Sequence, residues 1–429
     1  MASQDTAGTA SAAQLLEDFI SFLNESWTAY HATAEARRRL LAAGFEELDE
    51  SQPTHAVKPA SKSQKAGFLQ LSTQPYGGGL WHTWFDRDLG VAGRAIVKRG
   101  EGKYSHDLVK INRPVLRVPT LAIHLTKADE RKSFSPNLQN NFFPVLATEV
   151  KAKLAHAGLA VRWAPVQAYR SCVTSGKGDV RPGSCHLNDD ITFLYRCEPA
   201  DVEDFELQLC DTQPSCIGGA CSEFVFSGRL DNLCSSWQAI RALVDGCEGD
   251  GLAASKGVRS VFLFDHEEVG STSCHGAAGT LLPDCMKRRV RFGLAASPSD
   301  VVMEAVVRKS FLVSVDMAHA LHPNYQDRHE PALGPKMHSG MVLKHNANQR
   351  YATNAVTAFF FRELGARAGL PTQEFAVKSD SGCGSTIGPT LSALSGIRTV
   401  DVGSPQLSMH SVREMMGTDD AVYGYNHIK

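Results

Sequence analysis

From residue 205 to the C-terminus, short apolar segments typical of β-strands alternate with longer segments of helical character. The strand-like segments are FELQLCD, EFVFSGRLDN, SVFLFDHEE, FLVSVDMAHA, EFAVKSD and TVDVGSP, and the helical ones include SSWQAIRALVD and ATNAVTAFFFRELGARAG. Strands separated by helical stretches of roughly 10 to 18 residues favour a mainly parallel sheet with helices on both faces. The alternation therefore predicts an α/β fold, and a chain of 429 residues is long enough for a second domain.

The region before this alternation has two other patterns. In residues 13–41, apolar residues recur at helical spacing, which indicates two amphipathic helices. In residues 68–118, short apolar runs are punctuated by glycine, which is typical of consecutive β-strands. We therefore expect a split α/β domain with a β-rich domain inserted into it. The predicted α/β segments are residues 1–60 and 202–429, and the predicted insertion is residues 61–201.

The composition limits the class of partner. Charged residues make up 21% of the chain and the formal net charge is −2, so no one-signed field attracts nucleic acid or an anionic membrane. No apolar run approaches the roughly 18 to 20 residues that span a bilayer. The 11 cysteines form no C-x-x-C pair, which favours free thiols over a disulfide framework. These features predict a cytoplasmic protein that acts on a small molecule or a peptide.

Four of the predicted strands end in side chains that bind metal ions. Asp231 ends EFVFSGRLDN, Asp316 ends LVSVD, and TVDVGSP leads to His410. SVFLFDHEE ends in the adjacent pair Glu267 and Glu268. In open α/β sheets, ligands bind outside the carboxyl ends of the strands. A hydrolase with two zinc ions needs bridging and terminal ligands and one free carboxylate that takes a proton from water, and this set can supply them.

Each of these residues also has an ordinary structural explanation. A lone Asp after a strand usually caps a helix, and Ser411 and Glu414 after His410 could form a capping box for the last helix. The loop SGCGSTIGP at residues 381–389 suggests a phosphate loop, but it matches no phosphate-binding motif. Cys383 within it has no base nearby in the sequence. The coincidence of four strand ends favours a metal site.

Five sequence blocks together resemble the signature blocks of the M18 family of aspartyl aminopeptidases. In order, they are YGGGLWHTWFDRDL, GRLDN, FDHEEVGS, SVDMAHALHPNY and MHSVREMMG, and the resemblance extends from about Leu15 to the C-terminus. It implies a zinc-peptidase-like α/β fold with an inserted β-rich dimerisation domain. It also implies an enzyme that removes N-terminal Asp or Glu from peptides with two zinc ions, for which manganese or cobalt can substitute. The implied assembly is a large homo-oligomer built from dimers.

The same resemblance assigns a role to each candidate residue. Asp231 would bridge the two zinc ions, and Glu267 would be the general base. The metal ligands that it implies are Asp231, Glu268, Asp316 and His410. The substrate contacts that it implies are His124, His319, Lys344 and Tyr351, and His124 would reach into the site of a neighbouring subunit. An enclosed lysine such as Lys344 can pair with the side-chain carboxylate of an acidic substrate.

One family motif has no counterpart in this chain. Family members carry several strands that lead into an H-T-D-S-P motif, whose His binds zinc. This chain passes from AGFEELDE through SQPTHAVKPASKSQ directly into GFLQL, and His55 is off register. The loss would remove one imidazole ligand and would expose edges of the sheet. Two main hypotheses follow, an active aminopeptidase and a non-catalytic subunit; a nucleotide-binding protein that uses SGCGSTIGP is a third.

Overall fold

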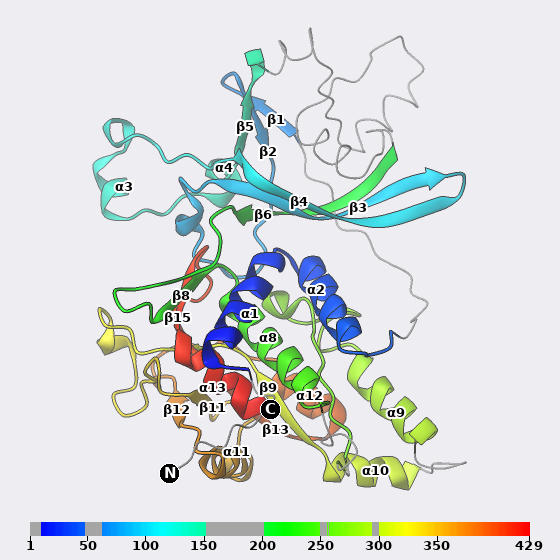
Figure 1. Cartoon of the computed structure of the whole chain (residues 1–429). Helices are drawn as coiled ribbons and strands as arrows, with labels where there is room; N and C mark the ends of the chain where they lie inside the picture. Colours follow the sequence, from blue (N-terminus) through cyan, green and yellow to red (C-terminus); the bar gives the residue numbers. More distant parts are fainter. Residues whose placement is uncertain (1–9, 48–61, 152–200, 249–254, 256, 294–299) are drawn as a thin grey trace.

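A computed structural model describes residues 10–47, 62–151, 201–248, 255, 257–293 and 300–429, with a helix-rich body below a strand-rich part in Figure 1. The helices of these ranges are α1 (Ala12–Glu25), α2 (Ala29–Ala42), α3 (Ala128–Lys132), α4 (Leu138–Asn141), α8 (Leu230–Asp245), α9 (Leu281–Gly293), α10 (Asp300–Lys309), α11 (Ala355–Arg367), α12 (Gly388–Ser395) and α13 (Thr418–Ile428). The strands of the strand-rich part are β1 (Lys62–Lys65), β2 (Phe68–Leu71), β3 (Leu89–Gly100), β4 (Lys103–Leu116), β5 (Val145–Thr148) and β6 (Val202–Asp211). The strands of the helix-rich body are β7 (Cys216–Gly218), β8 (Phe224–Ser227), β9 (Phe311–Val315), β10 (Ala318–His319), β11 (Met341–His345), β12 (Thr372–Ala376), β13 (Arg398–Gly403), β14 (Pro405–Leu407) and β15 (Glu414–Gly417).

The strands form four sheets. In the helix-rich body, a four-stranded sheet has the order β12-β11-β13-β9, and a five-stranded sheet has the order β10-β14-β15-β8-β7. In the four-stranded sheet, β11 is parallel to β12 and β13 is parallel to β9, whereas β11 and β13 are antiparallel. Two antiparallel three-stranded sheets, β4-β3-β6 and β1-β2-β5, form the strand-rich part. The predicted α/β class is confirmed, with sheets of mixed direction.

The strand-rich part includes one strand that the sequence pattern attributed to the α/β body. The segment FELQLCD forms most of β6, and β6 pairs antiparallel with β3 from Val202 to Asp211. It therefore completes the sheet of the β3–β4 hairpin. The division into residues 1–60 with 202–429 and 61–201 stays a prediction, and this pairing favours a second boundary after Asp211.

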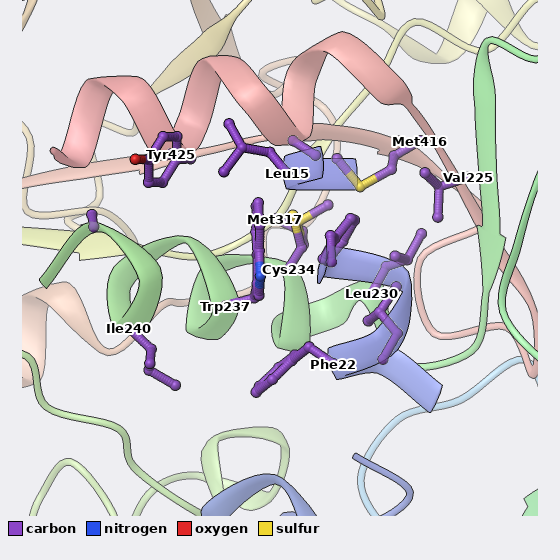
Figure 2. Close-up of a cluster of buried hydrophobic side chains, with 14 of the residues drawn as sticks. Leu15, Phe22, Val225, Leu230, Cys234, Trp237, Ile240, Met317, Met416 and Tyr425 are labelled. Atoms are coloured by element: carbon purple, nitrogen blue, oxygen red, sulfur yellow. The ribbon is translucent and has the colours of Figure 1, made fainter. Parts of the chain in front are cut away.

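The predicted N-terminal helices are confirmed, and α1 anchors the main core. A capping box starts α1, because Ser11 Oγ accepts from the Gln14 backbone N–H and Gln14 Oε1 accepts from the Ser11 N–H. Its buried face packs against α8, and the rings of Phe19 and Trp237 lie 4.8 Å apart. Figure 2 shows this cluster between α8 and α13, where Tyr425 also contributes its ring. Full burial of each large apolar side chain stabilises the fold by about 1.5–3 kcal/mol.

One edge of the four-stranded sheet has no partner strand in the described ranges. β9 stands at this edge and pairs with β13 alone. The prediction of a strand in SVFLFDHEE is wrong, because residues 258–264 form no strand. Phe264 packs on the same buried hydrophobic cluster as Leu312, which is on β9. The side chains next to them in the sequence are exposed, Leu263 by 43% and Val313 by 38%. The expected loss of neighbouring strands stays a prediction.

The cysteines and the helices of the described part of the chain bear on two predictions from the composition. Its cysteines are free thiols, from Cys210 to Cys383, as the sequence predicts. Among its helices, none has the length and apolar character needed to cross a membrane.

Candidate metal centre

Three side chains from distant parts of the sequence meet in the helix-rich body. They are Asp231 at the start of α8, Glu268 in the turn η5 (Glu267–Val269) and His410 between β14 and β15. One donor atom of each lies within 4.8 Å of the other two. His410 Nε2 is 3.4 Å from Asp231 Oδ2 and 3.2 Å from Glu268 Oε1. Two carboxylates and one imidazole are ligands that zinc accepts, and a catalytic zinc keeps its fourth position open.

Irregular backbone conformations place these donors. His410 has a φ of 65°, His266 before η5 has a φ of 63°, and Arg229 before α8 has a φ of 60°. Asp231 itself departs from helical geometry, with φ −83° and ψ 109°. Positive φ is uncommon outside glycine, and such residues gather at functional sites. The three turns that carry the donors thus share a feature that their sequences do not indicate.

Glu414 fixes two of the donors, and the sequence analysis missed this role. Its carboxylate accepts the backbone N–H of His410 at 2.9 Å and that of Asp231 at 3.1 Å. Burial raises its pKa to about 7. The predicted capping box of Ser411 and Glu414 is wrong, because Glu414 begins β15 and the last helix begins at Thr418. A lone Glu at the start of a short strand gives no signal of such a contact in the sequence.

The carboxylates of this centre crowd one another. Burial and the charges of Asp316 and Glu268 raise the pKa of Glu267 to about 7. Burial and Asp316 also raise the pKa of Asp231 well above its ordinary value. Hydrogen bonds to Asp231 and Glu268 raise the pKa of His410 to about 11. A divalent cation would relieve this repulsion and would displace the His410 proton.

In the metal-free chain, Glu267 should make folding depend on pH. A carboxyl whose pKa rises from 4.5 to about 7 on folding stabilises the fold fully below pH 4.5, and this contribution is lost as the pH rises through 7. Glutamine has no proton to lose in this range. From pH 5 to pH 8, the free energy of unfolding should therefore fall by about 1–3 kcal/mol more in the unmodified chain than in Glu267→Gln. Urea unfolding in a chelator measures the difference. An equal difference at both pH values would contradict the prediction.

Asp316 is held by Lys344. It follows β9, and its Oδ2 lies 3.2 Å from Nζ of Lys344 on β11, whose side chain is 4% exposed. Asn232 Nδ2 donates to the Val315 carbonyl at 2.8 Å and so joins the start of α8 to the end of β9. Asp316 is therefore close to the centre in the fold, but it is outside the group of three close donors. Its role as a metal ligand stays a prediction.

Two of the other predicted substrate contacts interact with Lys344. Its Nζ lies 5.5 Å from the centre of the Tyr351 ring. Burial, and then the charge of Lys344, lower the pKa of His319 to about 4, so its imidazole is neutral at pH 7. His124 instead lies in the exposed turn η2 (Ile123–Leu125) of the strand-rich part. Within the described ranges, no hydrogen bond or ion pair joins His124 to the other candidates, and all these roles stay predictions.

The loop SGCGSTIGP is tied to the buried carboxylate of Asp401. Thr386 Oγ1 donates to Asp401 Oδ1 at 2.7 Å, and the Ala352 backbone N–H donates to Oδ2 at 2.6 Å. Cys383 Sγ donates to Tyr351 Oη at 3.3 Å. The carboxylate of Asp401, which lies on β13 against this loop, would repel a phosphate group, and this disfavours the nucleotide-binding alternative. The loop supports Tyr351 instead.

Comparisons with known proteins agree on one family. The family model described as "Aminopeptidase I zinc metalloprotease (M18)" matches residues 51–429. A probable aspartyl aminopeptidase of Ricinus communis is 46% identical over 462 residues, which cover 96% of this chain and 94% of that protein. The aspartyl aminopeptidase of Dictyostelium discoideum is 39% identical, and the alignment covers 96% of this chain and 95% of that protein.

Solved structures give the same result for the fold. A chain in the cryo-EM structure of the Ape4 and Nbr1 complex matches with a TM-score of 0.85 and 35% identity, over 100% of this chain and 87% of that chain. The mApe1 dodecamer of Saccharomyces cerevisiae matches with a TM-score of 0.77 and 24% identity, over 96% of this chain and 95% of that chain. The second match shows a shared fold alone.

The alignment with the Ricinus protein is longer than the part of this chain that it covers. It spans 462 residues, but 96% of this 429-residue chain is about 412 residues. About 50 alignment positions are therefore gaps in this chain, and the loss of the H-T-D-S-P segment stays a prediction. His55, near the predicted gap, lies outside the described residues.

Proposed function

The chain belongs to the M18 family of zinc aminopeptidases, and on this premise we propose that it releases N-terminal Asp or Glu from peptides. The observation that carries the proposal is the meeting of Asp231, Glu268 and His410 beside the half-buried Glu267. Relatives at 39–46% identity over almost the whole chain bear the name aspartyl aminopeptidase, which supports the acidic specificity.

The donors fit one zinc ion at Asp231, Glu268 and His410. When bound, zinc supplies a Lewis acid that polarises a carbonyl and lowers the pKa of water. The family resemblance implies a second ion between Asp231 and Asp316, with manganese or cobalt as possible substitutes. In the described part of the chain, no imidazole completes this second set, so the donors there do not fit a second zinc.

The chain's own residues supply the remaining chemistry. Glu267 accepts a proton from the attacking water and donates it to the leaving amine. Lys344 binds the side-chain carboxylate of the substrate, since an ammonium has three donors and Asp316 takes one. His319 and Tyr351 line this side of the site.

A panel of aminoacyl p-nitroanilides tests the proposal. With zinc, manganese or cobalt supplied, kcat/KM for the Asp and Glu substrates should exceed that for Leu at least about 10⁴-fold, the range found where a site must pair a polar group. Chelation should abolish the activity. Preferential hydrolysis of the neutral substrates would disprove the acidic specificity.

A non-catalytic subunit is the second candidate, and the incomplete donor set at Asp316 favours it. In that case the purified chain should bind at most one zinc ion and should release no amino acid from any substrate of the panel. Turnover by the purified chain would reject this candidate.

We also propose a cytoplasmic homo-oligomer built from dimers through the β-rich part, with His124 reaching a neighbour's site. Around His124, large apolar side chains are exposed, with Leu121 at 60%, Ile123 at 58% and Leu125 at 70%. Such a patch is typical of a protein interface. The dodecamer formed by the yeast protein of the same fold supports a large assembly.

A further inference from the structure

We propose that residues 76–83, which we call the strap, position the zinc ligands Glu268 and His410. The strap belongs to the block YGGGLWHTWFDRDL and runs into the turn η1 (Trp81–Trp84). The inference rests on the proposed function, because it concerns the same metal site. Through the strap, the strand-rich part supports ligands that belong to the helix-rich body.

One end of the strap is fixed in the core of the strand-rich part. Trp81 within the strap and Phe85 just after it pack on the buried hydrophobic cluster that includes Phe142. The ring centres of Trp81 and Phe142 lie 6.1 Å apart, and those of Phe85 and Phe142 lie 5.6 Å apart. Such aromatic pairs contribute about 0.5–1.5 kcal/mol each beyond their area burial. The strap therefore extends from a well-packed base.

The other end of the strap lies against the turn that carries Glu268. Gly77 has a φ of 67°, and a Cβ added to it would lie 2.6 Å from the Glu268 carbonyl oxygen and 3.0 Å from its Cβ. A residue with a side chain fits there only if one of the two backbones moves. At the neighbouring Gly78, an added Cβ would meet no described atom within 4 Å. The close approach is therefore specific to position 77.

The middle of the strap holds the turn that carries His410. The Leu80 backbone N–H donates to the His410 carbonyl oxygen at 3.0 Å. Thr83 Oγ1 accepts the Val412 backbone N–H at 3.0 Å and donates to the Leu80 carbonyl oxygen at 2.7 Å. On its other side, the His410 backbone N–H donates to Glu414. The backbone of His410 is thus held by Glu414 within the body and by the strap from outside it.

Both ligand turns need such outside support. His266, at the start of the Glu268 turn, has a φ of 63°, and His410 has a φ of 65°. Conformations of this kind persist only where surrounding contacts hold them. The strap contacts both turns, so it fixes Glu268 and His410 relative to each other. Loss of a group that orients metal ligands costs about 10–100-fold in metal affinity.

Gly77→Ala tests the contact with Glu268. Zinc binding should weaken by about 10–100-fold, because the added methyl group displaces the Glu268 turn. Competition with a chromophoric chelator measures the affinity, and circular dichroism checks folding. Gly78→Ala makes the same change in open space, and Gly102→Ala makes it in the β3–β4 turn at a φ of 70°, where nothing described is within 4 Å. Both controls should bind zinc as the unmodified chain does.

Thr83→Val and Thr83→Ser test the contact with the His410 turn, and they decide the inference if Gly77→Ala does not fold. Valine has nearly the shape of threonine but cannot accept the Val412 N–H, so zinc affinity should fall about tenfold. Serine keeps the hydroxyl group, so Thr83→Ser should retain the affinity of the unmodified chain.

An unchanged zinc affinity in folded Gly77→Ala would overturn the inference, as would equal affinities of Thr83→Val and Thr83→Ser. Equal losses in Gly77→Ala and Gly102→Ala would also overturn it, because backbone strain rather than the contact with Glu268 would be the cause. A chain that binds zinc but cleaves no substrate of the panel would refute the proposed function, and the zinc affinities of the variants would still decide the inference. An unmodified chain that binds no zinc would overturn both.

Discussion

Glu267→Gln should lower kcat for an N-terminal aspartyl substrate by about 10²–10⁴-fold, the usual contribution of a general base. Glutamine has nearly the same shape but accepts no proton from water. Glu267 lies outside the group of three close donors, so the variant should keep its zinc. Steady-state kinetics and metal analysis on the same preparation measure the two effects.

Glu268→Gln is the matched control, because the two glutamates are adjacent in η5 and undergo the same chemical change. It should lose zinc together with activity, since Glu268 Oε1 lies 3.2 Å from His410 Nε2. If Glu267→Gln retained kcat within about threefold, Glu267 could not be the general base. If it lost zinc as Glu268→Gln does, Glu267 would be a ligand instead.

His410→Ala should weaken zinc binding by more than about 100-fold. The loss of a residue that only orients a ligand costs about 10–100-fold, and His410 supplies the one imidazole of the described donor set. Competition with a chromophoric chelator gives the affinity. Activity should fall in parallel and should return in part with excess zinc, because Asp231 and Glu268 remain.

The variant Glu414→Gln tests a residue that does not bind zinc itself but holds two of the zinc ligands in place. Glu414 touches the backbone of Asp231 and His410, so its replacement should cost about 10–100-fold in zinc affinity, less than the loss of His410. If His410→Ala bound zinc as tightly as the unmodified chain, His410 would not be a metal ligand. A greater loss in Glu414→Gln than in His410→Ala would mean that the variant is misfolded.

The candidate site was predictable where local sequence carries the chemistry. Asp231 and Asp316 are acidic residues at the ends of apolar segments, and they stand out for that reason. His410 follows another such end. Their closeness could be expected, because strand ends meet at one side of an α/β sheet. The segment before Glu267 and Glu268 forms no strand in the structure, although the two residues reach the same place.

The sequence by itself determined the helices α1 and α2, the α/β class and the residue types of the centre. These depend on periodicity and on side chains close together in the chain. Only the tertiary structure decided that β6 pairs with β3, that β9 has an open edge and that Lys344 contacts Asp316, 28 residues away. A strand's partner and a buried ion pair both depend on groups distant in sequence. Their stability comes from hydrogen bonds and desolvation that exist only after the chain has folded.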